Sequence, residues 1–521
     1  MAGKSKKKKE KGLESILFDC RNTLRGKVSS LTNRDAVMGL VFLKFAGDKF
    51  EKRKKEIKEQ YGDVPAFLEK PSFYLSENVF YLREHCRWSE IVKNAASNDI
   101  ANRIDQAMAD IEDDNKPLQG ALLQKFYANL GLETRVIKSL IDNVNQITEE
   151  RFQEKDLIGT VYEYFMRNFA YDSKQEKGEF YTPKCIVDLI AELIEPFKGR
   201  IYDPCCGTGG MFVQSIKFVE AHNGNKRDVS VFGQEENPDT YRLAKQNLAI
   251  RGISCNLGDK NASSFTDDRH KDLKVDYIMA NPPFNLKNWR GDDELTSDPR
   301  WSGYGTPPTS NANYAWILHM LSKLDSTDGI AGFLLANGAL SSPEEYEIRK
   351  NLIENDKIEA IFILPREMFY HPDISVTLWI LNNNKKAKTL NDRRLRDRQN
   401  EILFVDLRTW NQLHDANGAV MFDEKIIKNI KQIYNGWQDI NCPNKYEKPE
   451  LYNSINKAEL KKHNYTLLPS KYINFIDHDL EINSEKELKN IQAEMKNILS
   501  SQVSAENLLY KAFEEIGYAV K

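Results

Sequence analysis

The chain has 521 residues, a length at which one hydrophobic core no longer suffices, and we expect two or three domains. Hydrophobic residues make up 40% and charged residues 29%, which excludes a wholly disordered or fibrous chain. No apolar run reaches the roughly 18 residues of a membrane-spanning helix, and the lysine-rich start lacks the apolar stretch of a secretory signal. Seven scattered cysteines indicate neither a disulfide framework nor a metal site, and they favour the reducing cytoplasm.

The net charge of −3 conceals an uneven distribution. Residues 1–12 carry six lysines against Glu10, so the rest of the chain sits at −8. We predict a disordered basic tail over 1–12 that is either solvated or in contact with phosphate groups. Residues 385–398 hold seven basic and two acidic residues, and we predict a basic loop that is either solvated or bound to DNA. Proteins that hold DNA alone are usually basic overall, so DNA binding here would need a local patch or another subunit.

Both flanks of the chain have helical periodicity. Apolar residues at three- and four-residue steps predict an α-helical N-terminal domain over residues 13–150. Residues 481–521 are predicted to form a charged helix with one narrow apolar seam, which either packs on its own domain or meets a partner helix. The seam consists of Leu488, Ile491, Met495, Ile498, Leu499, Val503, Leu508, Leu509, Phe513 and Ile516.

Residues 151–480 alternate short β-rich runs with helical segments, beginning with an amphipathic helix over 156–170. This alternation predicts an α/β fold with a doubly wound, mostly parallel sheet. Two helix starts are marked, by Thr182 as a cap before Pro183 and by a capping box that begins at Ser342. The β-rich runs are RIYDP, VSVFGQE, VDYIMANPPF, GIAGFLLANG, IEAIFILP, SVTLWILN and EILFVDL, and the helical segments lie near 184–195, 211–222, 238–251, 313–324 and 343–355.

A glycine-rich turn follows the first β-rich run. Asp203 ends the run, and Gly207, Gly209 and Gly210 then allow positive φ angles and close approach of a ligand to the backbone. The helix that begins beyond the turn offers unpaired amides, so we expect a nucleotide-like ligand here, with a purely structural turn as the alternative. The motif is neither the dinucleotide fingerprint nor a P-loop.

Glu235 ends the second β-rich run. In α/β folds, a carboxylate at this place can accept both hydroxyls of a ribose. The alternative is that Glu235 and Glu236 only stabilise the start of the next helix.

Asn281, Pro282, Pro283 and Phe284 follow the third β-rich run. The two prolines stiffen the turn and remove two N–H donors, so carbonyl oxygens dominate it. These oxygens, with the amide of Asn281, suit an exocyclic amino group, and an adjacent aromatic ring can stack on a flipped base. The alternative is a rigid turn with Phe284 in the core.

Together these motifs resemble the S-adenosylmethionine-dependent DNA amino-methyltransferases, and the chain looks like the modification subunit of type I restriction–modification systems. The likeness covers about residues 13–480 and includes DPCCGTGG, NPPF, GEFYTP, GQEENPDTYRLAKQNLAIRGI, LANGAL and PREMFYHPDI. It implies a Rossmann-like methyltransferase domain that uses S-adenosylmethionine and no metal.

The resemblance also assigns residues to the cofactor. It implies that Glu235 binds the ribose and that Asp259 lies near the adenine, although the spacing at Asp259 departs from the family's. It assigns a cofactor-binding segment to Glu179, Phe180, Tyr181, Thr182, Pro183 and Lys184, and the turn around the methionine end to Asp203, Gly207, Thr208, Gly209 and Gly210.

For catalysis, the resemblance implies that Asn281 and the carbonyl of Pro282 accept the two hydrogens of the adenine N6 amine. This would free the nitrogen lone pair for in-line attack on the sulfonium methyl, while Phe284 stacks on the extruded adenine. The rival targets are the N4 amine of cytosine and a protein glutamine, and a silent cofactor-binding scaffold is a further alternative.

The family's partners follow from the same resemblance. The chain has no stretch long enough for its own target-recognition domain, so recognition of double-stranded DNA is expected from a separate specificity subunit. Two modification subunits would clamp one specificity subunit, restriction subunits would join for cleavage, and the C-terminal helix would be a docking surface.

Overall fold

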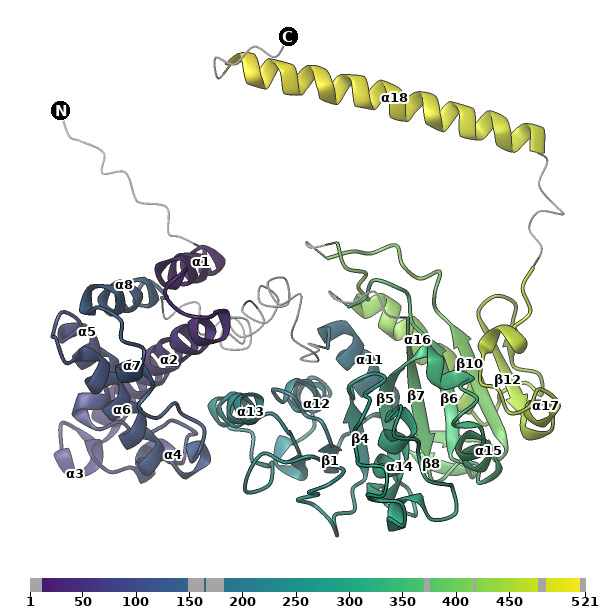
Figure 1. Cartoon of the computed structure of the whole chain (residues 1–521), viewed down its shortest axis with the longest axis horizontal. Helices are drawn as coiled ribbons and strands as arrows, with labels where there is room; N and C mark the ends of the chain where they lie inside the picture. The colour runs from purple at the N-terminus through teal and green to yellow at the C-terminus, as the bar shows by residue number, and fades with distance from the viewer. Residues whose placement is uncertain are drawn as a thin grey trace.

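The computed structural model describes residues 12–148, 164, 182–369, 375–415, 418–476 and 484–515 (Figure 1). The predicted basic tail, apart from Gly12, lies outside these residues. So does the predicted helix over 156–170, apart from Tyr164, which is helical and buried. None of the described helices combines the length and the hydropathy that a bilayer crossing requires.

Residues 13–144 are helical, as predicted, and α2 (Ser30–Tyr61) is the longest helix there. The side chain of Ser29 caps α2 by accepting a hydrogen bond of 3.1 Å from the Thr32 amide. The apolar first half of α2 is buried, and the Tyr127 hydroxyl donates to the carbonyl of Ala36 at 2.6 Å. The other elements are α1 (Leu13–Leu24), α3 (Pro65–Leu68), α4 (Ser72–Leu75), η1 (Glu84–Cys86), α5 (Trp88–Lys93), α6 (Ile100–Asp114), η2 (Lys116–Leu118), α7 (Phe126–Asn129) and α8 (Thr134–Val144).

The second region contains a ten-stranded sheet with the order β11-β12-β10-β6-β7-β5-β4-β1-β2-β3. Strand β1 pairs in parallel with β2 and β4, whereas β7 runs antiparallel between β5 and β6. The prediction of a mostly parallel sheet is confirmed. The strands are β1 (Gly199–Asp203), β2 (Val229–Gly233), β3 (Cys255–Asn256), β4 (Tyr277–Ala280), β5 (Ile330–Ala336), β6 (Ile358–Ile363), β7 (Val376–Asn382), β10 (Glu401–Asp406), β11 (Glu447–Lys448) and β12 (Tyr452–Asn456).

Helices cover both faces of the sheet, as expected for a doubly wound fold (Figure 1). Along β7, Leu378 and Ile380 join one core, and Trp379 and Leu381 join the other, because successive side chains of a strand point to opposite faces. The first core contains α11 (Lys184–Ile194), α12 (Gly210–Ala221), α13 (Pro238–Ile250) and α16 (Glu424–Gln438). The second contains α14 (Asn313–Lys323), α15 (Tyr346–Glu354) and α17 (Lys457–Lys462), and short turns are η3 (Lys226–Asp228), η4 (Pro299–Trp301), η5 (Asn337–Leu340) and η6 (Pro469–Lys471).

Both predicted helix caps are wrong. Helix α11 begins after Pro183, and the Thr182 hydroxyl instead accepts a hydrogen bond from Asn281. Helix α15 begins at Tyr346 without a side-chain cap, because Ser342 still belongs to the turn after η5, where its amide bonds to the carbonyl of Gly338. At α11 a contact with a distant segment replaces the local cap, whereas at α15 the Ser342 amide is held within the turn that precedes the helix.

The basic segment 385–398 is not a solvated loop. It contains an antiparallel hairpin of β8 (Lys388–Leu390) and β9 (Arg393–Leu395). Its cations turn inward to carboxylates of the same chain, so most of its charge is neutralised internally and is not available to DNA phosphates. The pairs are Lys385–Asp356, Lys388–Asp328, Arg393–Glu195, Arg396–Glu401 and Arg398–Glu359.

Helix α13 joins the two regions. Its residues Leu243, Ala249 and Ile250 belong to the hydrophobic core of the N-terminal helices. At the same contact, Arg242 lies 3.2 Å from Asp35, whose pKa is raised by burial against the opposing effect of the neighbouring arginines. The N-terminal helices are therefore packed directly on the sheet region.

The buried ion pair of the hairpin leads to a stability prediction. The side chains of Glu359 and Arg398 are 0% exposed, and their Oε1 and Nε atoms are 3.0 Å apart. Replacing Glu359 with alanine leaves an unpaired buried guanidinium, and we expect Glu359→Ala to destabilise the protein by about 3–5 kcal/mol. Urea unfolding measures the loss. The control Glu347→Ala, which breaks an exposed pair with Lys350, should change stability by less than about 0.5 kcal/mol.

Candidate active site

The candidate site lies where the strand order changes direction. Strands β1 and β4 are parallel neighbours, so their carboxyl ends, at Asp203 and Ala280, meet at one edge of the sheet. Open α/β sheets bind ligands in the crevice outside such strand ends. A cavity of about 350 Å³ lies here. Its wall includes Cys205, Gly207, Thr208, Glu235, Thr240, Ala262, Ser263, Ser264, Phe265, Asn281, Pro283, Trp289 and Trp316.

The glycine-rich turn leaves space at the cavity. Gly207 has a φ of +52°, and a Cβ atom added there or at Gly210 would meet no atom within 4 Å. Gly209 has a φ of +80° and packs against the side chain of Leu248, so its role is structural. The open side of the turn is therefore at Gly207 and Gly210, where a ligand can approach the backbone.

Asp203 is buried at the base of this turn, with 1% of its surface exposed. Burial raises its pKa to about 7, against the hydrogen bond of 3.0 Å that its carboxylate accepts from the Cys205 amide. A cationic partner stabilises the ionised form of a buried carboxylate, because the partner offsets the loss of hydration.

Glu235 is held in place by two backbone amides. Its Oε2 accepts from the Gly207 amide at 3.0 Å, and its Oε1 accepts from the Asn237 amide at 2.8 Å. The cap of α13 is the Asn237 side chain, which accepts from Asp239 and Thr240, so capping alone does not explain Glu235. A carboxylate can accept about four hydrogen bonds, and Glu235 lines the cavity.

Asn281 presents an unsatisfied acceptor. Its Nδ2 donates to the Thr182 hydroxyl at 2.9 Å, and its Oδ1 is buried with no hydrogen-bond partner among the described residues. A buried polar atom without a partner costs about 1–3 kcal/mol, so its presence in a cavity wall indicates a ligand donor.

The rest of the tetrapeptide surrounds Asn281 in different ways. Pro283 lines the cavity, whereas Pro282 is buried. The ring of Phe284 lies edge-on to that of Phe369, with 6.2 Å between their centroids, and is not part of the cavity wall. Phe284 thus borders the site from the side of the PREMF segment.

Residues 262–265 form a wall that the sequence did not reveal. The Phe265 ring lies 4.6 Å from that of Trp289 and 4.2 Å from that of Trp316, centroid to centroid. The indole nitrogen of Trp316 is a buried donor without a partner in the described structure. Phe265 and the tryptophans offer aromatic faces, and Trp316 adds a donor to the same cavity wall that contains the acceptor of Asn281.

Arg300 holds this wall in place through hydrogen bonds to its backbone. Its guanidinium donates to the carbonyls of Ser264 at 2.9 Å and Phe265 at 2.7 Å. It also binds both carboxylate oxygens of Asp298 and contacts Nδ1 of His319 at 3.0 Å. Burial lowers the pKa of His319 to about 3, so the imidazole is neutral and can accept from Arg300.

Several candidates are not part of the cavity wall, including Asp203, Thr182, Pro183, Gly209 and Gly210, which lie in the segments beside it. Asp259 forms an exposed ion pair with Arg269, and Lys184 pairs with Asp188 on the surface of α11. Neither residue lines the cavity. The candidates Glu179, Phe180 and Tyr181 lie outside the described residues.

Sequence comparisons extend over nearly the whole chain. The N-6 DNA Methylase family matches residues 153–480, and the HsdM N-terminal domain family matches residues 13–144. The type I restriction enzyme HindI methylase subunit of Haemophilus influenzae is 36% identical over 430 residues, 80% of this chain and 93% of the relative. The MjaIX methylase subunit of Methanocaldococcus jannaschii is 30% identical over 97% of this chain and 91% of the relative.

Solved structures share the fold. A type I restriction-modification methyltransferase subunit from Streptococcus thermophilus superposes with a TM-score of 0.71 and 21% identity, covering 89% of this chain and 99% of that one. A modification subunit of a putative type I restriction enzyme from Vibrio vulnificus gives a TM-score of 0.61 and 17% identity, covering 88% and 94%. The strand order, the crevice and these likenesses agree, and the chain belongs to the N-6 DNA methylase family as a type I restriction–modification methylase subunit.

Proposed function

We propose that this chain transfers a methyl group from S-adenosylmethionine to the N6 amine of an adenine flipped out of double-stranded DNA. The observation that carries the proposal is the buried Oδ1 of Asn281, which lies in the wall of the glycine-turn cavity and has no hydrogen-bond partner within the described ranges of the chain. The family of the chain shows the class of reaction, which is N-6 methylation of DNA. We place this activity in the cytoplasm, where methylation protects host DNA and, with the restriction subunit, allows restriction of foreign DNA.

The residues of the cavity fit the cofactor. The turn from Asp203 to Gly210 has open backbone for the methionine end, and the Asp203 carboxylate suits its amino group. Glu235 accepts the ribose hydroxyls, and the wall over 262–265 takes the adenine in place of Asp259. When bound, S-adenosylmethionine supplies an electrophilic methyl group on a sulfonium.

Asn281 acts on the target amine. Its Nδ2 is anchored by Thr182, so its Oδ1 is oriented before any base arrives and accepts one N6 hydrogen. The carbonyl of Pro282 accepts the second hydrogen, which localises the nitrogen lone pair for attack. Phe284 borders the flipped adenine, and the rigid proline pair holds these groups at a fixed spacing.

The first test replaces the proposed acceptor. We expect Asn281→Ala to reduce methyl transfer at least 100-fold, the order observed when one transition-state hydrogen-bonding group is removed. Cofactor binding should be retained, because Asn281 is assigned to the amine. The assay is tritiated-methyl transfer to plasmid DNA with a co-expressed specificity subunit, together with calorimetric titration of S-adenosylmethionine.

A matched control is Asn444→Ala, the same change at an exposed position outside the cavity wall. It should keep full activity. Full activity in Asn281→Ala would refute the assignment of Asn281, and digestion of the product DNA to nucleosides identifies the labelled base as adenine or cytosine.

The second test uses the pKa of Asp203. Because the free site holds this pKa near 7 and the cationic amino group of the cofactor favours the ionised carboxylate, binding releases a proton below pH 7. Affinity should therefore rise by up to about tenfold per pH unit between pH 5.5 and 7 and level off above. Calorimetric titrations across this range measure how the affinity for S-adenosylmethionine depends on pH. The variant Asp203→Asn should bind S-adenosylmethionine weakly and without this pH dependence. The same pH dependence in the variant as in the wild type would exclude Asp203 from the cofactor site.

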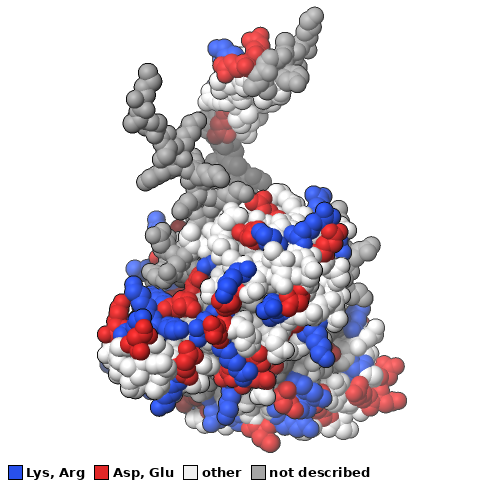
Figure 2. Space-filling view, turned by 90° about the vertical axis from the view of Figure 1, so that its left-hand side faces the viewer, with Lys and Arg blue, Asp and Glu red and all other residues white. Residues whose placement is uncertain are grey.

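Target recognition must come from elsewhere. Positive and negative side chains are interleaved over the face of the N-terminal helices (Figure 2), and the basic hairpin is paired internally. We infer that a specificity subunit reads the DNA between two copies of this chain and that restriction subunits join for cleavage. This inference is supported by the membership of the chain in the family of type I methylase subunits.

Helix α18 (Ser484–Glu515) is the surface assigned to the specificity subunit. It stands apart from the sheet region in Figure 1, and its apolar seam is exposed, with Met495 at 61% and Ile498 at 66%. An exposed apolar seam of this length is characteristic of a partner interface.

The third test introduces one charge into the seam. We expect Met495→Glu to lower recovery of the modification subunit on a tagged, co-expressed specificity subunit at least tenfold, because burial of an unpaired carboxylate opposes association. Ser500→Glu places the same charge outside the seam and should leave recovery unchanged, as should cofactor binding in both variants. Equal recovery of the two variants, and of a chain lacking residues 485–521, would exclude the seam as the docking surface.

A further inference from the structure

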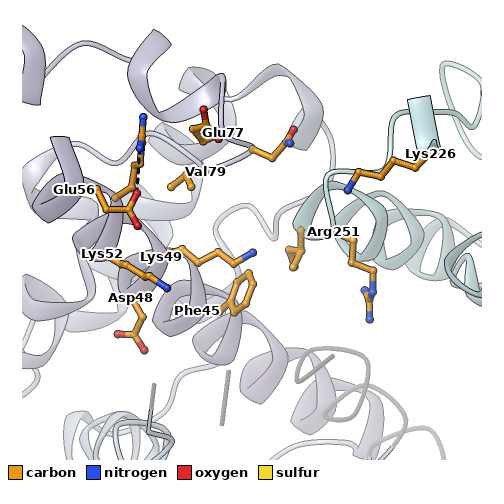
Figure 3. Close-up of a pocket in the computed structure, with 12 residues that line it drawn as sticks. Phe45, Asp48, Lys49, Lys52, Glu56, Glu77, Val79, Lys226 and Arg251 are labelled. Carbon is orange, nitrogen blue, oxygen red and sulfur yellow. Dashed lines mark hydrogen bonds and ion pairs between the residues drawn. The ribbon is translucent and has the colours of Figure 1, made fainter. Parts of the chain in front are cut away.

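A second cavity lies at the junction of the N-terminal helices and the sheet region (Figure 3). It has a volume of about 460 Å³. One wall comes from α2 and from the segment 77–79, and the other comes from Lys226 of η3 and from Ile250 and Arg251 at the end of α13. It is separate from the methyltransferase crevice, whose wall shares none of these residues.

Positive side chains from both regions converge on this cavity. Lys49 of α2 and Lys226 of η3 point toward one another across the gap in Figure 3. Lys52 extends from the same helix as Lys49. Arg251 lies on the same side as Lys226, and its guanidinium donates to the carbonyl of Asn247 at 2.9 Å. These four of the five cations in the lining come from three separate elements, an arrangement that local sequence patterning does not explain.

The carboxylates of the lining do not balance these charges. Asp48 forms an ion pair with Lys44 at 2.5 Å, and Glu56 pairs with Arg53 at 3.1 Å. Glu77 is exposed and lies on the N-terminal side of the cavity, away from Lys226. Lys226 itself lies 3.4 Å from Glu220, an exposed carboxylate outside the cavity lining. Within the lining, five cations, including Arg53, stand against three carboxylates, so the cavity keeps a net positive charge.

Lys49 is the best placed of the four. Its ammonium lies 4.5 Å from the centroid of the Phe45 ring, and in the described part of the chain it has no ion pair with a carboxylate. Its pKa is lowered by burial of the ammonium and then by the charges of Arg251, Lys226 and Lys52. Mutual repulsion of this kind costs free energy that an anion between the cations would recover.

We propose that this junction binds a small phosphate-bearing anion, held between Lys49 and Lys52 on one side and Lys226 and Arg251 on the other. The volume suits a solute of the size of pyrophosphate or a nucleotide, and Val79 and Ile250 supply apolar wall beside the charges. An anion here bridges the two regions of the chain, so its binding stabilises their packing. The proposal is independent of the methyl-transfer reaction.

The test titrates inorganic pyrophosphate into the full-length protein by calorimetry at low ionic strength. The wild type should bind, and Lys49→Gln and Lys226→Gln should each weaken binding at least fivefold. Lys49→Arg keeps the charge and should restore most of the affinity. The matched control is Lys55→Gln on the same helix, whose side chain is 79% exposed and outside the cavity, and it should bind like the wild type.

Binding of S-adenosylmethionine to each variant confirms that the methyltransferase region is folded. Absence of pyrophosphate binding to the wild type overturns the proposal, and so does equal binding by all five proteins. A parallel titration with a short DNA duplex distinguishes the source of the phosphate. If the duplex binding depends on Lys49 and Lys226 while pyrophosphate gives no heat, the site is a DNA contact and the small-anion proposal is wrong.

Discussion

The parallel pairing of β1 with β4 is the constraint on which the site depends. It places the chain segment after Asp203 beside the segment after Ala280, although the two are far apart in sequence. The glycine turn and the tetrapeptide at Asn281 consequently line one cavity, with the proposed cofactor residues at the ends of β1 and β2 and the proposed amine acceptor at the end of β4. Loss of that register would separate the glycine turn from Asn281 even if every side chain were kept.

Much of this arrangement could be predicted from local sequence. The alternation of apolar runs and helices predicted the strands of the central sheet, and Asp203, Glu235 and Asn281 were found because each lies at or just beyond the end of a strand. Strand ends are short-range features, and the edge on which they meet follows from the parallel topology. The positions of Glu235 and Asn281 in the cavity wall agree with these expectations, while their roles in binding and catalysis remain predictions.

Other features depend on contacts that sequence separation conceals. The wall over 262–265 follows no strand end and is held by Arg300, a residue from a later loop. Thr182 was expected to cap a helix, but its hydroxyl instead anchors Asn281. The basic segment 385–398 shows the same limit. Its sequence predicts a solvated loop, because its carboxylate partners, such as Glu195 and Glu359, are distant in the sequence.

Helix α13 has a consequence for how the protein moves. On one flank its Leu248 supports Gly209 and its Asn247 donates to the Thr208 carbonyl at 2.7 Å; on the other its Arg242 reaches Asp35 among the N-terminal helices. A helix packed on both regions couples them mechanically: a displacement of the N-terminal helices would shift α13 and, through Leu248 and Asn247, the glycine-rich turn. The position of the N-terminal helices and the shape of the turn at the cavity are therefore linked within a single chain.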